Sequence, residues 1–199
     1  MSTLSAPHDV RQHILDTARP ILGRKGFSAV GLNEILGAAG VPKGSFYHYF
    51  ASKEAFGEAL LEQYFTTGLA RIDAILSDSG GTAADRLMRY WQGWRDAQTG
   101  SDACGQCLAV KLGAEVCDLS EGMRAILADG TRRIVARLER GVTAGGDDGS
   151  LPRVDDPGHV AMVLYQLWLG ATLLAKFTRD HRPFDEAMAT TRTLLALPP

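Results

Sequence analysis

The densest group of side chains suited to contacting DNA lies between residues 43 and 49. Its polar and aromatic members are Lys43, Ser45, Tyr47, His48 and Tyr49. A lysine can neutralise a phosphate or reach guanine, and hydroxyl and imidazole groups can hydrogen-bond to phosphate oxygens or base edges. Gly44 lets the backbone come close to a duplex. This composition is typical of a DNA-contacting helix and not of an enzyme core.

A short turn over residues 40–42 separates this segment from an expected helix over residues 32–39. Pro42 suits a first helical turn, where its missing N–H has no partner in any case. So short a turn forces the two helices to cross steeply, as in a helix-turn-helix, whose second helix enters the major groove. Gly31 lies directly before the expected helix over residues 32–39. Lys53 stands at the start of the next long helix, where free N–H groups favour a phosphate.

The chain is expected to be helical nearly throughout, because apolar residues recur at helical spacing and no alternating strand pattern appears. Expected helices cover residues 8–25, 32–39, 43–49, 53–76 (capped by Ser52), 83–98, 104–116, 120–142, 157–178 and 184–195. Residues 143–156 are polar and glycine-rich and are expected to form the one long loop. The predicted fold class is therefore all-α.

The first three helices suit a compact three-helix head, with the helix-turn-helix at about residues 31–50. Expected members of its core share helical spacing and are Ile14, Ala18, Leu22, Phe27, Ile35, Val41, Phe46 and Phe50. A domain boundary is expected near residue 68, with residues 8–68 in the DNA-binding domain and residues 69–199 in a second domain.

Charge and composition favour a soluble protein with a local DNA footprint. The 199 residues include 45% hydrophobic residues and carry a net charge of −2. Residues 1–55 contain six Lys/Arg and four Asp/Glu, which gives a net charge of +2. Residues 56–199 contain 15 Lys/Arg and 19 Asp/Glu, which gives a net charge of −4. A mildly basic head permits nucleic-acid binding without broad adhesion. The start of the chain lacks a signal-peptide core, and apolar residues 160–175 are too few to span a bilayer, so a cytoplasmic protein is expected.

The N-terminal pattern resembles the TetR family of bacterial transcriptional repressors. The segments that carry the resemblance are Gly26-Phe27, Ile35, residues 39–50 and residues 52–56. Gly31 departs from the pattern, because many members have a threonine there that caps the helix and lies near phosphate. The resemblance implies an all-helical homodimer that binds double-stranded operator DNA. It also implies a C-terminal domain that binds a small effector and dimerises, with no cofactor, metal or catalytic residue.

The expected helix over residues 157–178 is apolar nearly all round and must be buried on most of its surface. Its apolar positions are Val160, Val163, Leu164, Leu167, Ala171 and Leu174. A monomer could bury it internally, and pairing with residues 184–195 across a two-fold axis would bury it equally well. With the family resemblance, these residues are predicted to form a dimer interface.

Residues 107–121 and 164–171 resemble the electrophile-sensing branch of the family, which includes the repressor of N-ethylmaleimide reductase genes. That repressor responds to quinones, reactive aldehydes and hypochlorous acid through cysteine. The resemblance implies that Cys107 is the sensing thiol and that Lys176 can bond covalently to its oxidised sulfur.

The residues themselves leave the role of Cys107 open. Its place near a helix start, with Lys111 one turn on, favours an ionised thiol, but a free cysteine is also a common small hydrophobic core residue. The Cys104–Cys107 spacing could belong to a thioredoxin-like enzyme, but no strands are expected. It could also bind zinc, but Cys117 alone remains as a further thiol ligand.

Four aromatic residues, Trp91, Trp94, Tyr165 and Trp168, are expected to lie in the C-terminal core. They could instead line an effector pocket, together with Cys104 and Lys111, because apolar walls with polar tips suit small ligands. A reversible aromatic or hydrophobic effector is therefore an alternative to an electrophile. A ligand carrier or enzyme with a vestigial head is an alternative from another class, which the intact DNA-contacting segment argues against.

Overall fold

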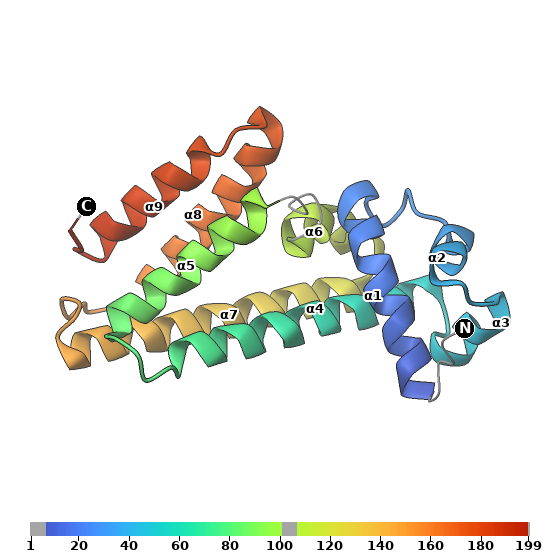
Figure 1. The fold of residues 1–199 in the computed structure, drawn as a ribbon, viewed down its shortest axis with the longest axis horizontal. Helices are drawn as coiled ribbons and strands as arrows, with labels where there is room; N and C mark the ends of the chain where they lie inside the picture. Colours follow the sequence, from blue (N-terminus) through green and yellow to red (C-terminus); the bar gives the residue numbers. More distant parts are fainter. Residues whose placement is uncertain (1–6, 101–106, 199) are drawn as a thin grey trace. The chain divides into compact units, whose positions relative to one another are not determined.

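The computed structural model describes residues 7–100 and 107–198, which contain α-helices and no strands. The helices are α1 (Pro7–Lys25), α2 (Leu32–Ala39), α3 (Lys43–Tyr49), α4 (Lys53–Leu76), α5 (Ala83–Thr99), α6 (Leu108–Leu119), α7 (Glu121–Asp148), α8 (Pro157–Thr178) and α9 (Arg182–Leu194). Figure 1 shows their order along the chain. The all-α prediction is confirmed.

The described residues divide into two compact units. The N-terminal unit contains residues 7–65 and 107–128, and the C-terminal unit contains residues 66–100 and 129–198. Helices α4 and α7 each contribute to both. This division by packing differs from the expected boundary near residue 68, because α6 and the first turns of α7 pack with the N-terminal helices. The sequence contains no local signal for such a long-range association.

The core of the N-terminal unit lies between α1, α2, α3 and the start of α4. Helix α1 buries a stripe with helical spacing, which consists of Ile14, Leu15, Ala18, Ile21 and Leu22. Phe46 of α3 packs on Phe50 and Phe56, with ring centroids 5.1 and 5.5 Å away. Seven of the eight expected core residues are buried, and Val41 is half-buried. Burial of these side chains supplies most of the stability that the short α2 and α3 lack on their own.

Indole rings dominate the core of the C-terminal unit. Trp91 of α5 stacks on Trp168 of α8, with centroids 5.1 Å apart and an interplanar angle of 15°. The indole N–H of Trp168 donates to Thr191 at 2.9 Å, and that of Trp94 donates to Thr172 at 3.0 Å. Both threonine hydroxyls donate in turn to helix carbonyls, so these buried polar groups are satisfied.

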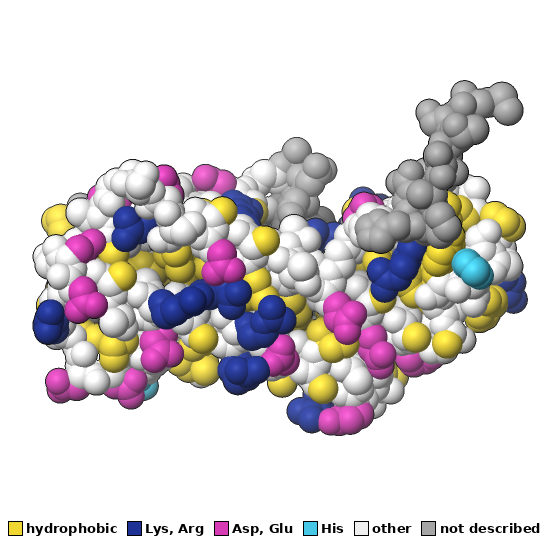
Figure 2. Space-filling view, turned by 90° about the horizontal axis from the view of Figure 1, so that it is seen from below, with side chains coloured by type: hydrophobic (Ala, Val, Ile, Leu, Met, Phe, Trp, Pro, Cys, Tyr) yellow, Lys and Arg dark blue, Asp and Glu magenta, His cyan; other side chains and the backbone are white. Residues whose placement is uncertain are grey.

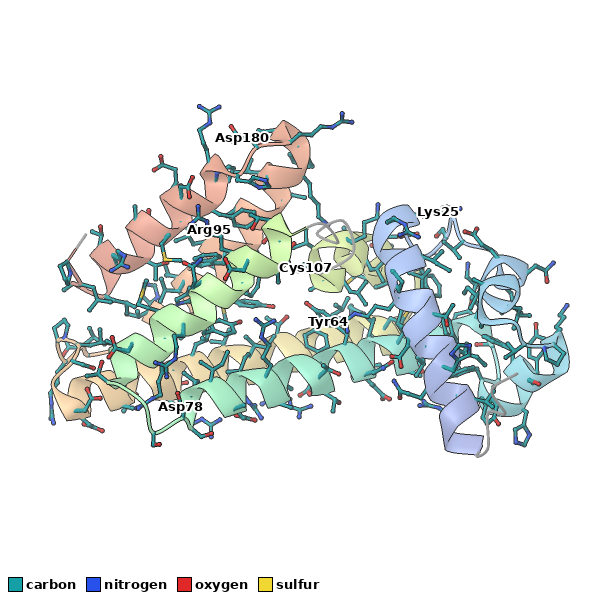
Figure 3. All side chains as sticks on the ribbon, viewed as in Figure 1. Lys25, Tyr64, Asp78, Arg95, Cys107 and Asp180 are labelled. Carbon is teal, nitrogen blue, oxygen red and sulfur yellow. The ribbon has the colours of Figure 1, made fainter. Side chains whose placement is uncertain are left out.

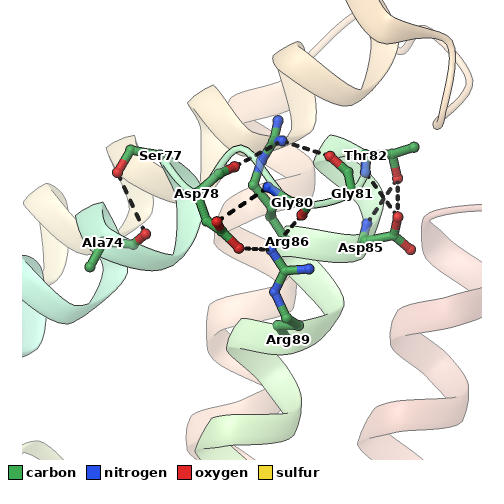
Figure 4. A network of polar contacts seen from close by, with 9 residues as sticks. All are labelled: Ala74, Ser77, Asp78, Gly80, Gly81, Thr82, Asp85, Arg86 and Arg89. Carbon is green, nitrogen blue, oxygen red and sulfur yellow. Dashed lines mark hydrogen bonds and ion pairs between the residues drawn. The ribbon is translucent and has the colours of Figure 1, made fainter.

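Polar contacts hold the turn between α4 and α5 (Figure 4). Arg86 donates to the carbonyls of Asp78 and Gly81, and Arg89 pairs with the Asp78 carboxylate at 2.7 Å. Thr82 and Asp85 form a reciprocal capping box at the start of α5. The backbone N–H of Thr82, followed by its hydroxyl, holds the pKa of Asp85 below its usual value. The turn is therefore fixed by satisfied polar groups.

Charged side chains of both signs alternate on the surface. On the face drawn in Figure 2, basic and acidic groups lie interspersed with apolar ones. Within the C-terminal unit, Arg137 of α7 forms a bidentate pair with Asp73 of α4, with both distances 2.8 Å.

Helix α7 is longer than expected, and α6 begins later. The prediction of a loop from residue 143 is wrong as far as Asp148, where α7 ends. Glycine lowers helix propensity, but Gly145 is buried against Leu151, and an added Cβ would lie 2.5 Å from that side chain. Close packing therefore outweighs the propensity. Of the expected helix start at residues 104–107, residues 104–106 lie outside the described residues, and Cys107 is the N-cap of α6.

Helix α8 begins and ends where the sequence predicted. The rest of the chain buries only part of the surface of this helix. By length and composition it is, within the described part of the chain, the one helix apolar enough to span a membrane, and 33% of its most apolar window is buried. Its exposed apolar side chains are Met162, Leu173, Leu174 and Phe177. A monomer therefore leaves an apolar face of α8 uncovered.

Replacing Thr82 by alanine should destabilise the protein by about 1 kcal/mol, because an N-cap hydroxyl and its half of a capping box are removed. Chemical denaturation at fixed protein concentration measures this change. Thr143→Ala is the matched control, since Thr143 lies within α7 and its hydroxyl donates to the Glu139 carbonyl without capping a helix. Equal destabilisation of both variants would contradict the role of the capping box.

Candidate nucleic-acid interface and sensor site

The turn between α2 and α3 has the backbone geometry of a tight helix end. Gly40 adopts a left-handed conformation with φ of 66°, which costs glycine little. Its N–H donates to the Gly37 carbonyl at 3.4 Å, and that of Val41 donates to the Leu36 carbonyl at 3.2 Å. Pro42 is the N-cap of α3 with φ of −71°. The turn is thus closed in three residues, as the sequence predicted.

Burial of one side chain sets the orientation of α3. Phe46 is fully buried, so the opposite side of this seven-residue helix faces solvent. The exposed residues are Lys43, Gly44, Tyr47 and His48, and Ser45 and Tyr49 are half-buried. Tyr47 is 52% exposed, and the Lys43 ammonium lies 5.9 Å from the centre of its ring. Most of the predicted DNA-contacting groups therefore share one accessible face.

The two other predicted DNA-contacting residues, Gly31 and Lys53, lie outside α3 and have different surroundings. Gly31 is the N-cap of α2 in an extended conformation, with no side-chain cap and no atom within 4 Å of the place where a Cβ would stand. Lys53 instead donates to the Phe27 carbonyl at 2.8 Å, and its ammonium lies 4.7 Å from the centre of the Phe27 ring. Lys53 thus has a structural contact that the sequence did not predict.

A histidine that the sequence analysis did not assign links α1 to the helix-turn-helix. His13 Nε2 lies 2.9 Å from the Ala39 carbonyl oxygen, at the last residue of α2. This contact requires the tautomer or ion that has hydrogen on Nε2. The exposed carbonyls at a helix C-terminus are suitable acceptors, and the contact fixes α2 against α1.

Cys107 lies at the N-terminal end of α6 and is 3% exposed. Its sulfur is 3.8 Å from the Tyr64 hydroxyl of α4 (Figure 3). The Arg19 guanidinium of α1 lies 5.6 Å from the centre of the Tyr64 ring. The Lys111 backbone N–H donates to the Cys107 carbonyl at 3.0 Å, as in a first helical turn. A helix N-terminus favours a thiolate over a thiol. Tyr64 has no sequence signal that could have identified it.

The other predicted sensor residues are dispersed. Lys176 is half-buried in the last turn of α8, so it belongs to the C-terminal unit and Cys107 to the N-terminal one. Cys117 is a half-buried free thiol on α6, and Lys111 is also half-buried. Cys104 lies outside the described residues.

The predicted aromatic group does come together, since Trp91, Trp94, Tyr165 and Trp168 are in mutual ring contact. Trp91, Tyr165 and Trp168 are buried, as expected of core residues. The indole Nε1 of Trp91 is buried without a hydrogen-bond partner. Among these three indoles, Trp91 therefore retains an unused donor, and leaving one buried costs about 1–3 kcal/mol.

Comparison with known proteins identifies two family models along the chain. The model "Bacterial regulatory proteins, tetR family" matches residues 14–60, and "Tetracyclin repressor-like, C-terminal domain" matches residues 83–191. The first match covers the helix-turn-helix, and the second runs from α5 into α9 and includes α6, which packs with the N-terminal unit.

Similar proteins are named as transcriptional regulators. The chain is 41% identical to the HTH-type transcriptional repressor NemR of Escherichia coli, over 96% of each chain. It is 31% identical to the repressor DhaR of Mycobacterium sp. over 89% of this chain and 87% of DhaR. The crystal structure of reduced E. coli NemR superposes with a TM-score of 0.90 over 96% of this chain and 99% of that one.

Proposed function

The chain belongs to the TetR family of bacterial regulatory proteins, and on this basis we propose that it is a transcriptional repressor released from its operator when Cys107 reacts. Its relatives are named as repressors and not as enzymes. The exposed polar face of α3 opposite buried Phe46 supports DNA binding more directly than any other feature. The protein then acts in the cytoplasm, where the operator lies.

On operator DNA, α3 is the helix that enters the major groove. Lys43 supplies positive charge for a phosphate or guanine, and the Tyr47 and His48 side chains offer polar tips to base edges and backbone. Gly31, Gly44, Ser45 and Tyr49 contribute close backbone approach and shorter-range polar contacts. Lys53 supports the interface indirectly, because its ammonium group donates a hydrogen bond to the Phe27 carbonyl. Its role in binding phosphate is secondary.

Lys43→Ala should weaken operator binding and reduce the slope of log affinity against log salt by about 0.9 for each phosphate that is no longer neutralised. Tyr47→Phe, which removes one hydroxyl, should weaken binding about three- to ten-fold with little change in that slope. Fluorescence anisotropy with operator fragments at several salt concentrations measures both effects. Lys25→Ala is the control, because Lys25 pairs with Glu34 at 2.6 Å outside α3. Unchanged affinity in properly folded variants would remove these roles.

Cys107 is supported as the sensor by two features of its own unit. Cys107 is the N-cap of a twelve-residue helix, and its sulfur lies 3.8 Å from the Tyr64 hydroxyl. The helix dipole and a hydroxyl donor both stabilise negative charge on sulfur. Cys117, half-buried within the same helix, lacks the position at the helix end. Resemblance to NemR adds weight to the same choice.

The reaction with an unsaturated carbonyl compound is a conjugate addition. The Cys107 thiol loses its proton to solvent, and the thiolate electron pair forms a bond to the β-carbon. The carbon–carbon π pair moves toward the carbonyl, and the α-carbon then takes a proton from water. With hypochlorous acid the thiolate would take up chlorine and release hydroxide, which leaves a sulfenyl chloride on Cys107. A neutral amine would then displace chloride and lose a proton to water, which forms a sulfur–nitrogen bond, and the family resemblance points to Lys176 for that amine.

N-ethylmaleimide or hypochlorous acid should release the wild-type protein from operator DNA, and Cys107→Ser should block that release. Serine keeps the size of the side chain but is a far weaker nucleophile at neutral pH. Anisotropy titrations before and after treatment should show that affinity falls by about 5-fold or more in the wild type. Cys117→Ser, on the same helix, should respond as the wild type does. A Cys107→Ser protein that still dissociates would exclude the thiol switch.

Tyr64→Phe should slow the reaction of Cys107 with N-ethylmaleimide on the order of ten-fold at neutral pH, since a hydrogen bond to an ionised group is removed. Phenylalanine keeps the ring on which Arg19 lies, so packing is preserved. Mass spectrometry of quenched samples follows the adduct at Cys107, and the adduct at Cys117 is the internal control. An unchanged rate would show that the hydroxyl does not assist the thiol.

The dimer of this repressor is proposed to form through α8 and α9. A groove of about 580 Å³ lies between them, with Leu167, Gly170 and Leu174 on one side and Glu186 and Thr190 on the other. Val160, Val163 and Leu167 are half-buried, and Leu174 is 51% exposed. Leu164 and Ala171 are already buried inside the chain, so a second copy would contact the neighbouring exposed apolar residues instead.

A reversible aromatic or hydrophobic effector is the second candidate, and the unused Trp91 donor favours it. A ligand carbonyl that reached the Trp91 Nε1 would accept that hydrogen bond. Dissociation that persists in Cys107→Ser and follows an aromatic carbonyl compound would support this alternative over the thiol switch.

A further inference from the structure

The carboxylate of Glu115, on α6, binds the turn between α1 and α2. Its Oε2 accepts from the Phe27 backbone N–H at 3.0 Å, and its Oε1 accepts from that of Ser28 at 2.6 Å. The donors lie 87 and 88 positions earlier in the chain. Two charge-assisted hydrogen bonds from one side chain are both strong and directional. They join α6 to the backbone just ahead of the helix-turn-helix.

The turn itself is shaped for this carboxylate. Gly26 has φ of 95°, and a Cβ at that position would lie 3.0 Å from Oε2 of Glu115. On its other side the turn is fixed to α4, because Lys53 donates to the Phe27 carbonyl and the Phe27 ring lies against Gly57. An added Cβ at Gly57 would lie 2.7 Å from that ring. The turn is therefore held between α4 and α6 by close contacts on both sides.

The Glu115 carboxylate is ionised near neutral pH. Burial opposes its charge, but the hydrogen bonds from Ser28 and Phe27 outweigh that cost and hold the pKa of Glu115 below its usual value. A lowered pKa means that these bonds stabilise the folded state above the unfolded-state pKa of glutamate. That stabilisation disappears as the pH falls through the lowered value.

Helix α6 connects Glu115 directly to the sensing thiol. Cys107 is the N-cap and Glu115 lies eight residues later on the same helix, a distance of about 12 Å along the axis. A short continuous helix moves as one rigid body, so a displacement of its first turn also displaces its third turn. Both residues belong to the N-terminal unit.

We infer that Glu115 is the residue through which α6 couples the state of Cys107 to the DNA-reading head. In the reduced protein the carboxylate holds the turn at residues 26–28 and, through it, the start of α2. An adduct on Cys107 displaces α6 and pulls or breaks the two hydrogen bonds, so the head leaves the position that fits the operator. This inference rests on the proposed thiol switch.

The first experiment measures coupling as the ratio of operator affinities before and after alkylation by N-ethylmaleimide. It uses a Cys104→Ser, Cys117→Ser background in which Cys107 is the remaining thiol. The background protein should show a ratio in the range of about 5–150, and Glu115→Ala should bring it to within about two-fold of unity. Glu115→Gln keeps an acceptor oxygen and should give an intermediate ratio. Glu121→Ala is the control, because Glu121 pairs with Arg124 on its own helix.

A second measurement needs no DNA. Hydrogen exchange at the Phe27 and Ser28 amides should accelerate several-fold when Cys107 is alkylated. In Glu115→Ala exchange should be fast already and insensitive to alkylation. DNA release without a change in exchange would overturn the role of Glu115 and leave the thiol switch standing. A change in exchange without DNA release would show that loosening this turn does not free the head, and it would overturn both the inference and the thiol switch. An unchanged affinity ratio in folded Glu115→Ala would also overturn the inference.

Discussion

Burial of Phe46 is the interaction on which the DNA-contacting surface depends. Helix α3 has seven residues, too few to be stable in water without tertiary packing. The contacts of Phe46 with Phe50 and Phe56 fix its rotation as well as its position. Because burial of Phe46 leaves Lys43, Tyr47 and His48 exposed on the rest of the helix surface, one buried ring decides which groups can reach DNA. A smaller side chain there would leave a cavity and also free the helix to turn.

The same head is held from outside by polar contacts to its backbone. His13 binds the end of α2, and Lys53 and Glu115 bind opposite sides of the turn that precedes it. Hydrogen bonds to backbone groups in a turn restrict position more tightly than apolar contacts, because they are directional. A DNA-reading head needs this restriction, since two heads must match half-sites at a fixed spacing.

Local rules were sufficient to predict much of the fold. The bounds of α2, α3 and α8 follow from Gly40, Pro42 and the Asp156-Pro157 start, where capping and backbone preferences agree. The extension of α7 through Gly145 and Gly146 could not be predicted, because packing against Leu151 outweighs propensity there. The exposed face of α3 was predictable from residue types at helical spacing. Tyr64 and Glu115 were not, because their roles depend on partners 43 to 88 residues away in the chain.

The burial of Cys107 bears on how a sensor of this kind can work. A thiol that is 3% exposed reacts more slowly than a surface thiol, and it admits only small reagents. The same burial makes the reaction consequential, because an adduct adds several heavy atoms to a side chain that is already enclosed by protein. Overpacking of a dense core costs about 1–3 kcal/mol or more and is relieved by moving a backbone element. In the proposed switch, helix α6, whose N-cap is Cys107, is the element that moves, and a coupling energy of this size is enough to change operator affinity. In the proposed switch, selectivity and signal thus have one physical origin, the burial of the sulfur.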